Sequence, residues 1–391
     1  MPGFEITRRK SLHALAGFLA GSPLLQAQLD PVRDHSRVPG IKELLTAYEF
    51  EAVMYARQTR AVYNYRAYGE ESEFTLRRNR QAFDWVKLVA NQTSTANIAT
   101  ATEVFGTKMA FPIMVSPTAL HGDLDKEGEQ ATHKGAEAAS NTPMILSNNS
   151  SLSFDKVAAA AKSPMWVQLY PKQALDANRT YLEAAQENGA RAVVVTIDQQ
   201  SSTYERSAHD RNLNAGGRGG RFSGVGPILG SNPYRVPSNR LWYEWKFFSE
   251  IRPFVKVPII AKGILTAEDA KLCLENGVDG IYVSNHGGRS LDYGPSTLEV
   301  LPEIVDAVGG KVPILFDSGL RRGSDILKAL ALGANAVCLG RVPLWGLGSF
   351  GAAGVTRVLE IMQAELVEAM RQTGCTSLES INRKIVLADL P

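Results

Sequence analysis

Hydrophobic residues along most of this chain gather in short runs that alternate with amphipathic segments. Apolar residues recur at helical spacing between several of the runs, at residues 127–139, 174–187, 267–275 and 324–332. Eight of the runs are short enough to be buried strands, namely residues 111–116, 144–147, 165–170, 192–198, 257–262, 280–284, 312–317 and 336–340. Eight buried strands alternating with helices predict an α/β fold of the (β/α)8 TIM-barrel type.

A doubly wound open sheet has the same alternation of strands and helices and is the structural alternative. Eight is the strand number of the barrel, and no G-x-G-x-x-G turn follows the run at 111–116. The sequence also repeats itself, because Val-Pro-Ile-Ile at 257–260 parallels Val-Pro-Ile-Leu at 312–315. Such an echo is consistent with a half-barrel or quarter-barrel repeat, so we favour the barrel.

Two further regions, one before the first predicted strand and one after the fourth, do not follow the alternation of strands and helices. Before the first strand, residues 42–64 and 75–88 have helical patterns, and a tyrosine-rich stretch between them ends at Gly69. We expect these segments to form an N-terminal helical extension. After the fourth strand, residues 199–252 are rich in Gly, Ser, Asn, Pro and Arg. A loop of that length within a compact domain is usually either a functional lid or partly disordered.

The beginning of the chain has the composition of an export signal. Arg8-Arg9-Lys10 precedes a stretch without charged residues, and the apolar core at 12–25 is too short to span a bilayer. The pattern resembles a twin-arginine signal, with cleavage near Ala27, and an amphipathic or disordered tail is the alternative. It predicts a periplasmic or otherwise exported protein; without it, the protein is expected in the cytoplasm. The predicted divisions are 1–27 (signal), 28–41 (linker) and 42–391 (barrel, with the active-site loop at 199–252).

Composition narrows the class of protein further. With 44% hydrophobic and 21% charged residues in 391, the chain has ample material for a core. The net charge of +2 gives no indication of a nucleic-acid partner. The three cysteines are too few and too scattered for a disulfide framework or a metal site, and Cys338 lies in an apolar run where burial is expected.

The candidate chemistry lies in the stretch 284–293, Ser-Asn-His-Gly-Gly-Arg-Ser-Leu-Asp-Tyr, which follows the sixth predicted strand. His286 can exchange a proton near neutral pH, and Arg289 offers a planar cation suited to a carboxylate. Gly287 and Gly288 let the backbone turn sharply and leave room for a flat ligand. Taken alone, His286 is more simply a structural histidine and Arg289 a solvated arginine. The carboxyl ends of barrel strands converge on one face, however, where active sites lie.

The stretch 284–293 resembles the signature of the FMN-dependent 2-hydroxy-acid oxidase and dehydrogenase family, departing only at Ser290, where Gln is usual. Gln168-Leu169-Tyr170, Thr196-Ile197-Asp198 and Gly340-Arg341 match further family motifs in the same order, and the resemblance covers about residues 42 to 385. Other departures are Gln199-Gln200 after the aspartate, the Gly- and Arg-rich sequence at 215–221, and Asn149, where some relatives place an aromatic.

The resemblance implies FMN-dependent oxidation of a small L-2-hydroxy acid to the 2-oxo acid, with His286 as the base. Its implied catalytic residues are His286, Asp198 and Tyr170, and its implied substrate-binding residues are Tyr65, Tyr170, Arg206, His286 and Arg289. Arg206 matches only if one inserted residue is allowed, and Tyr65 could equally pack the N-terminal helices.

The resemblance also implies which residues contact the cofactor. Lys262 is expected near N1 and O2 of the flavin, where a cation stabilises the reduced ring. The loops after strands seven and eight are expected to hold the phosphate, as in other barrels, although one of Arg321 and Arg322 is expected to be solvated. The implied cofactor-binding residues are Pro117, Thr118, Ala119, Ser147, Gln168, Thr196, Lys262, Ser284, Asp317, Ser318, Gly319, Arg321, Gly340 and Arg341, with no metal.

Two other functions are compatible with an FMN barrel. An isomerase would keep the phosphate site but has no need of Tyr65, His286 and Arg289, and an electron carrier or scaffold would have no need of a base. The sequence leaves the substrate and the electron acceptor open, either oxygen or a respiratory acceptor. An exported protein would favour a dehydrogenase. The family resemblance further implies a homotetramer.

Overall fold

The computed structural model describes residues 37–91, 96–198 and 244–391. The chain divides into two compact units, residues 1–44 and 45–391. In the described part of the first unit, the short 3₁₀ helix η1 (Ile41–Glu43) is accompanied by an ion pair of 2.6 Å between Arg37 and Glu43. The second unit contains all the features that follow.

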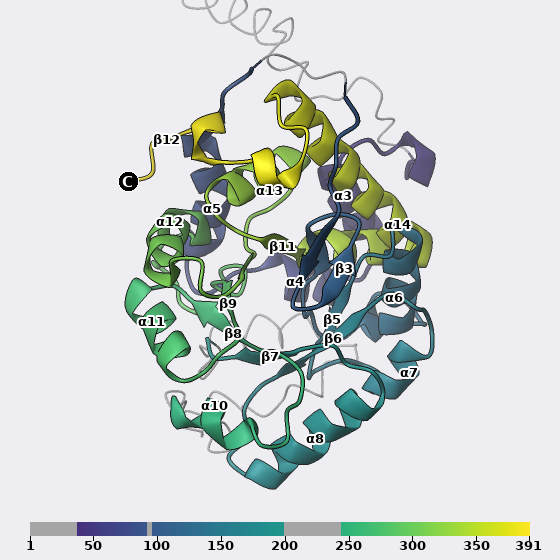
Figure 1. The fold of residues 1–391 in the computed structure, drawn as a ribbon. Coiled ribbons are helices and arrows are strands. Elements are labelled where there is room, and N and C mark those ends of the chain that lie inside the picture. Colours follow the sequence, from purple (N-terminus) through teal and green to yellow (C-terminus); the bar gives the residue numbers. More distant parts are fainter. Residues whose placement is uncertain (1–36, 92–95, 199–243) are drawn as a thin grey trace, which may run out of the picture. The chain divides into compact units, whose positions relative to one another are not determined.

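Eight parallel strands close into a barrel in the order β10-β11-β4-β5-β6-β7-β8-β9 (Figure 1). Closure is made by β11 pairing with β4, so that Val337 lies opposite Ile113. This arrangement confirms the predicted (β/α)8 fold and excludes the open sheet. The strand bounds are β4 (Ile113–Val115), β5 (Met144–Leu146), β6 (Met165–Leu169), β7 (Val193–Thr196), β8 (Ile259–Ile264), β9 (Gly280–Val283), β10 (Ile314–Phe316) and β11 (Ala336–Leu339).

Each strand lies within or close to the apolar run that predicted it, and the predicted and observed bounds differ only at the strand ends. Seven of the eight strands are fully buried along their length, as the uniform hydrophobicity of the runs requires. The fifth barrel strand, β8, begins after Pro258, which has no N–H to donate, and continues through a register shift at Gly263.

Helices flank the barrel strands (Figure 1). Ser296 caps α12 by accepting a hydrogen bond from Glu299 N–H, and Gly309 ends that helix in the left-handed conformation. The long C-terminal helix bends where Phe350 and Gly351 leave helical geometry. The flanking helices are α6 (Glu129–Ala138), α7 (Phe154–Ala158), α8 (Leu175–Glu187), α10 (Lys246–Ile251), α11 (Ala267–Glu275), α12 (Thr297–Val308), α13 (Gly323–Ala331) and α14 (Arg341–Gln372).

The predicted helix at 42–64 is wrong in its continuity. The structure has two helices, α3 (Ala47–Arg57) and α4 (Arg60–Ala67), because Gln58 is extended and the Thr59 hydroxyl caps the second helix.

The predicted helix at 75–88 is correct only in its first part, where α5 (Phe74–Gln81) runs into the 3₁₀ helix η2 (Ala82–Trp85). Its last three residues instead form β1 (Val86–Leu88), which pairs antiparallel with β12 (Val386–Ala388). A pairing partner 300 positions away in the sequence leaves no local signal. Of the predicted loop at 199–252, residues 199–243 lie outside the described part, and α10 occupies most of the rest.

A β-hairpin closes the amino-terminal end of the barrel. Its strands are β2 (Thr102–Val104) and β3 (Thr107–Met109), and the sequence analysis did not identify them. Val104 and Met109 join the interior residues of the barrel in one hydrophobic core, and Phe105 at the hairpin turn contacts Trp166 edge to face, with ring centroids 5.6 Å apart. A side chain at Gly280 would collide with the Phe105 ring, so the glycine leaves the space that this ring occupies.

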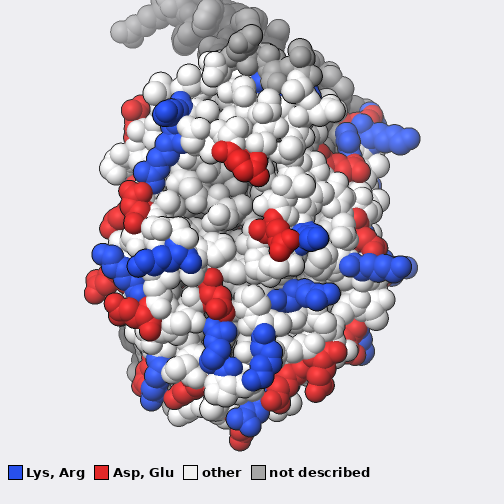
Figure 2. Space-filling view, viewed as in Figure 1, with Lys and Arg blue, Asp and Glu red and all other residues white. Residues whose placement is uncertain are grey.

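On the face seen in Figure 2, lysine and arginine alternate with aspartate and glutamate and form no extended patch of one sign. None of the helices in the described ranges is long and apolar enough to cross a membrane. Cys273, Cys338 and Cys375 are free thiols and are buried, as expected for Cys338.

We predict that the Phe105→Ala variant loses about 2–4 kcal/mol of unfolding free energy, because it leaves a cavity at the closed end of the barrel. Urea denaturation of the purified variant measures this loss. Leu387→Ala is the control, because Leu387 is 59% exposed and its truncation should cost about 0.5 kcal/mol or less. Equal losses in the two variants would show that the hairpin is not part of the core.

Candidate active site

The predicted site residues of the described chain lie on or just after the barrel strands, or on α4. Because the strands are parallel and closed into a ring, their carboxyl ends meet at one end of the barrel. The site residues come from β6, β7 and β8 and from the segments that follow β4, β5, β6, β7, β9, β10 and β11. Arg206 lies outside the described residues.

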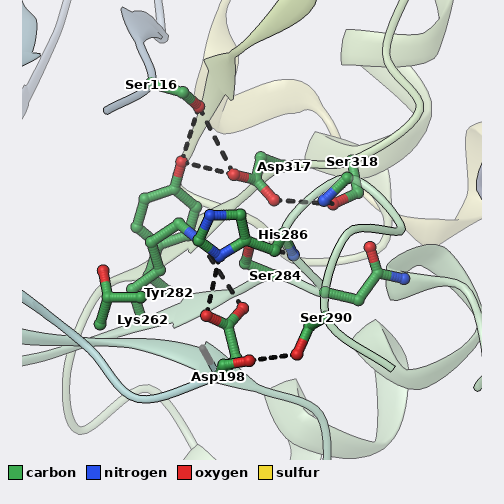
Figure 3. Close-up of polar contacts among 12 residues, drawn as sticks. Ser116, Asp198, Lys262, Tyr282, Ser284, His286, Ser290, Asp317 and Ser318 are labelled. Atoms are coloured by element: carbon green, nitrogen blue, oxygen red, sulfur yellow. Dashed lines mark hydrogen bonds and ion pairs between the residues drawn. The ribbon is translucent and has the colours of Figure 1, made fainter. Parts of the chain in front are cut away.

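His286, Asp198 and Lys262 form a compact group of ionisable side chains (Figure 3). His286 Nδ1 lies 2.9 Å from Asp198 Oδ1, and Lys262 Nζ lies 3.8 Å from Asp198 Oδ2. The Lys262 ammonium is also 3.5 Å from His286 Nδ1. The lysine and aspartate side chains are only 3% and 7% exposed, against 18% for the histidine. The histidine is therefore the member of the group that a ligand can reach most readily.

The charges in this group keep Asp198 ionised. Burial by itself would raise the pKa of Asp198, but the positive charge of Lys262 and the contact with His286 together lower the pKa below its usual value. Within the described chain, Asp198 Oδ2 has no hydrogen-bond donor, so the charge of Lys262 is its main compensation there. An ionised Asp198 accepts a hydrogen bond from Nδ1 of His286, which leaves Nε2 of a neutral ring unprotonated.

Tyr170 faces that second nitrogen. Its hydroxyl lies 3.4 Å from His286 Nε2, and the two rings are nearly parallel with centroids 6.4 Å apart. The backbone N–H of Tyr170 donates to Asn148 Oδ1, which fixes the chain just after β6. A proton acceptor and a phenol therefore converge on one point at the mouth of the barrel.

Arg289 and Tyr65 come together at the edge of this site. The Arg289 guanidinium lies 5.1 Å from the centre of the Tyr65 ring and donates to the backbone carbonyl of Tyr68 at 2.7 Å. Tyr65 lies on α4, so the helical extension contributes directly to the site. The pair presents a cation and a phenol, the two groups that the sequence predicts for binding a carboxylate.

The glycines of the turn have one of their two expected roles. His286, Gly287 and Gly288 all have left-handed backbone angles, with φ of 58°, 68° and 74°, so the sharp turn is confirmed. A Cβ at Gly288 would lie 2.6 Å from Leu76 N, and one at Gly287 would lie 2.7 Å from Arg341 Nη1. The space beside both glycines is thus filled by protein atoms rather than left for a flat ligand.

The residues around these glycines fasten the turn to α5. Asn285 and Asn79 exchange two side-chain hydrogen bonds of 2.7 and 2.8 Å. The Asp292 carboxylate accepts from the backbone N–H groups of Ser72 and Thr75, both at 2.9 Å. Asn79 is a functional neighbour that the sequence analysis missed, because a single polar residue on a helix carries no signal of a distant partner.

A row of amide and hydroxyl groups crosses the ends of β5, β6 and β7. Gln168 accepts from Asn148 N–H at 2.9 Å and from the Ser147 hydroxyl at 3.4 Å, and its amide donates to Thr196 Oγ1 at 2.9 Å. All three predicted residues of the row are buried. Ser284 lies nearby, and its hydroxyl accepts from the backbone N–H of His286 at 3.1 Å.

Behind Thr118 lies His121, which the sequence analysis did not identify. The two ring nitrogens of His121 lie 2.8 Å from the hydroxyls of Thr118 and Thr132, and the side chain is fully buried. Burial lowers the pKa of His121 to about 4, although Glu129 acts in the opposite direction. The ring is therefore neutral at physiological pH and serves as a fixed hydrogen-bonding support for Thr118. Pro117 and Ala119 flank Thr118 in the same loop.

The loop after β10 differs in part from the prediction. The Asp317 carboxylate is buried and accepts from Tyr282 Oη at 2.8 Å, so it is directed into the barrel rather than toward a phosphate (Figure 3). Arg321 is held 4.7 Å above the Trp345 ring, whereas Arg322 pairs with Glu365 and is the more exposed of the two arginines, as expected of one of them.

Gly319 is fixed by packing, and Arg341 is fixed by hydrogen bonds. A side chain at Gly319 would collide with the carbonyl of Asn79. Arg341 follows Gly340 and donates to the backbone carbonyls of Arg66, Tyr68 and Gly287, at 2.7, 3.3 and 2.9 Å. Arg341 therefore ties α4 to the turn of His286.

The donors at this end of the barrel fit a flavin mononucleotide. The buried Lys262 ammonium, the Gln168 amide and the Thr196 hydroxyl offer the mixture of donors and acceptors that the polar edge of an isoalloxazine ring requires. Arg321 follows Ser318 and Gly319 in the loop after β10, and an arginine together with backbone amides is a combination suited to a phosphate dianion. In the described ranges, no group of three or more His, Cys, Asp or Glu residues is arranged to hold a metal ion.

Comparisons with known proteins agree with this site. Residues 54–388 match the model of a family described as FMN-dependent dehydrogenase. A peroxisomal (S)-2-hydroxyacid oxidase of Arabidopsis thaliana is 36% identical over 352 residues, covering 88% of this chain and 96% of the relative. Glycolate oxidase of Spinacia oleracea is 35% identical over 370 residues, covering 89% and 96%. The crystal structure of a mandelate oxidase superposes with a TM-score of 0.80 at 30% identity, covering 89% of this chain and 99% of that one.

We predict that His121→Asn makes the stability of the protein less dependent on pH. Because the folded pKa of about 4 lies below the unfolded value near 6.5, neutral His121 favours the folded state above pH 6.5. This contribution, up to about 3 kcal/mol, is lost as the pH falls from about 6.5 to 4. Thermal melts of both proteins between pH 7 and 4.5 measure the difference. Parallel loss of stability in the two proteins would contradict the prediction.

Proposed function

The chain belongs to the FMN-dependent dehydrogenase family, and on that premise we propose that it oxidises a small L-2-hydroxy acid to the corresponding 2-oxo acid. The observation that carries the proposal is the orientation of His286 by Asp198, at 2.9 Å, with Tyr170 at the opposite nitrogen. A base held in this way is what removal of a proton from a hydroxy acid requires.

His286 accepts a proton of the substrate at Nε2. The resulting imidazolium is stabilised by the ionised carboxylate at Nδ1, because Asp198 keeps its charge beside Lys262. Tyr170 donates a hydrogen bond to the substrate oxygen that loses hydrogen, and its nearly parallel stacking with His286 holds both groups on one side of the substrate. These roles are the same whether the carbon that bears the hydroxyl loses its hydrogen as a proton or as a hydride.

FMN, when bound, supplies the two-electron acceptor of the reaction. We assign its ring contacts to Lys262 and to the polar row at the ends of β5 to β7, and its phosphate to Arg321 and the backbone that follows β10. Lys262 places a buried positive charge where negative charge accumulates on reduction, and this stabilises the reduced state. The proposed cofactor residues are Pro117, Thr118, Ala119, Ser147, Gln168, Thr196, Lys262, Ser284, Gly319, Arg321, Gly340 and Arg341, with Asp317 and Ser318 contributing through their backbone.

Arg289 and Tyr65 bind the substrate carboxylate in this proposal. A guanidinium offers two parallel N–H groups, which match a carboxylate better than a single ammonium does. The same pair argues against the isomerase, which needs no carboxylate clamp, and the base at His286 argues against a passive electron carrier. The relatives named above are described as acting on hydroxy acids of different sizes, so we leave the side chain of the substrate open.

We propose four finer features from the sequence alone. We propose oxygen or a respiratory carrier as the final electron acceptor and a homotetramer as the assembly. We also propose residues 1–27 as an export signal and Arg206 as a further substrate ligand, both outside the described residues.

The proposed function predicts that the purified protein is yellow and that its flavin absorbance bleaches anaerobically when L-lactate, glycolate or L-mandelate is added. His286→Ala should keep the bound flavin and lose the bleaching by a factor of at least about 100, because the base contributes about 10²–10⁴-fold. Stopped-flow absorbance gives the rates, and D-lactate and D-mandelate are the substrate controls. Bound flavin that none of these acids reduces would refute the proposal.

We predict that Arg289→Lys weakens apparent binding of the hydroxy acid by about 10-fold, since one ammonium replaces a bidentate fork. The rate of flavin reduction at saturating substrate should fall less than the affinity. Arg322→Lys is the matched control, because Arg322 is an exposed arginine paired with Glu365 away from His286. An equal effect of the two substitutions would remove Arg289 from the substrate site.

A further inference from the structure

The buried carboxylate of Asp317 has protein donors on both of its oxygens. Oδ1 accepts from the Ser318 hydroxyl at 2.8 Å, and Oδ2 accepts from Tyr282 Oη at 2.8 Å and from the Ser116 hydroxyl at 3.4 Å. The residue is only 7% exposed. Because both oxygens already accept hydrogen bonds from the protein, this carboxylate is not a ligand for a phosphate. The two negative charges would also repel each other.

The carboxylate lies beneath two strained turns that face each other. At the end of β9, His286, Gly287 and Gly288 are left-handed, and at the end of β10, Ser318 and Gly319 are left-handed with φ of 81° and 89°. His286 and Ser318 are not glycines, so each holds this conformation only because its surroundings impose it. One direct hydrogen bond joins the turns, from Gly287 N–H to Ser318 Oγ at 3.1 Å.

The direction of that hydrogen bond depends on Asp317. A hydroxyl has one hydrogen, and Ser318 gives its hydrogen to Asp317 Oδ1. The lone pairs of Ser318 Oγ are then left to accept from Gly287 N–H. The carbonyl of Gly287 is also held, because Arg341 donates a hydrogen bond to it at 2.9 Å. The residue that follows His286 is therefore clamped at both its N–H and its C=O.

We propose that Asp317 is a positioning residue for His286. It acts through the Ser318 hydroxyl (Figure 3), which in turn accepts from the backbone N–H of Gly287. Tyr282 and Ser116 hold the carboxylate from inside the barrel, so the catalytic turn is braced against the barrel core. The inference rests on the proposed function only in making His286 the residue whose position matters. Asp317 thus acts on the base, and the cofactor meets only its backbone.

Amide hydrogen exchange tests the clamp without reference to activity. In Asp317→Asn and in Ser318→Ala, the Gly287 amide, followed in the peptide 283–290, should exchange about 2- to 10-fold faster, as expected for loss of one hydrogen bond. Asp279→Asn is the matched control. Asp279 precedes β9, at the end of that strand opposite to the His286 turn, and its carboxylate accepts from Ile259 N–H at 2.7 Å. Asp279→Asn should leave exchange at 283–290 unchanged.

Kinetics and cofactor affinity test the consequence. Asp317→Asn and Ser318→Ala should each slow anaerobic flavin reduction by about 10-fold, since small displacements of a base cost that much or more. The double variant should be little slower than either single variant, because both remove the same link. FMN affinity, measured by flavin fluorescence on dilution, should change much less than the rate. Ser318→Ala carries the test if Asp317→Asn does not fold.

Three results would overturn the inference. Unchanged exchange at Gly287 in both variants would show that no clamp exists. An equal loss of FMN affinity and rate would return Asp317 to the cofactor site, and additive effects in the double variant would separate the two residues. A wild-type protein that no hydroxy acid reduces would instead refute the proposed function, while the exchange experiment would still decide the role of Asp317.

Discussion

Closure of the eight-stranded ring is the constraint on which the site depends. Hydrogen bonding between β11 and β4 brings the last strand of the barrel beside the first, with Leu339 opposite Val115. The loops after strands distant in the sequence therefore share one mouth, and the hydroxyl of Ser116, which follows β4, lies 3.4 Å from the carboxylate of Asp317, which follows β10. Asp198, Lys262 and His286 come from the neighbouring strands β7, β8 and β9. Inside, close packing of the barrel residues and the hairpin holds the strand ends at fixed separations.

Within that frame, the site works through a balance of charge. One carboxylate, Asp198, is shared by the ammonium of Lys262 and by a histidine that becomes a cation only when it takes a proton. Ser290 adds a hydrogen bond from its hydroxyl to the backbone carbonyl of Asp198, at the position where the family resemblance leads one to expect Gln. The loop that carries His286 therefore contacts both the main chain and the side chain of Asp198.

The sequence was sufficient to predict the barrel because buried parallel strands are uniformly apolar and easily counted. It also placed His286, Asp198, Tyr170 and Lys262 at the strand ends, where the structure brings them into contact. It failed where the deciding partner is remote. Val86–Leu88 became a strand through pairing with the C-terminus, and the carboxylate of Asp317 turned inward because Tyr282 presents a hydroxyl inside an otherwise apolar strand. His121 gave no signal, since a buried histidine between two threonine hydroxyls depends on packing that spacing does not encode.

The attachment of the catalytic turn to α5 has a consequence for how the protein acquires its activity. The amide pair between Asn79 and Asn285 joins positions 206 residues apart, and the contact of Asp292 with Thr75 spans 217. Contacts of such separation form slowly, because a long loop must close before they stabilise anything. A nascent chain can assemble its first strands while the base still lacks its support. Catalytic competence therefore arrives late in folding, after the first helices and the sixth barrel strand have both been made and have found each other.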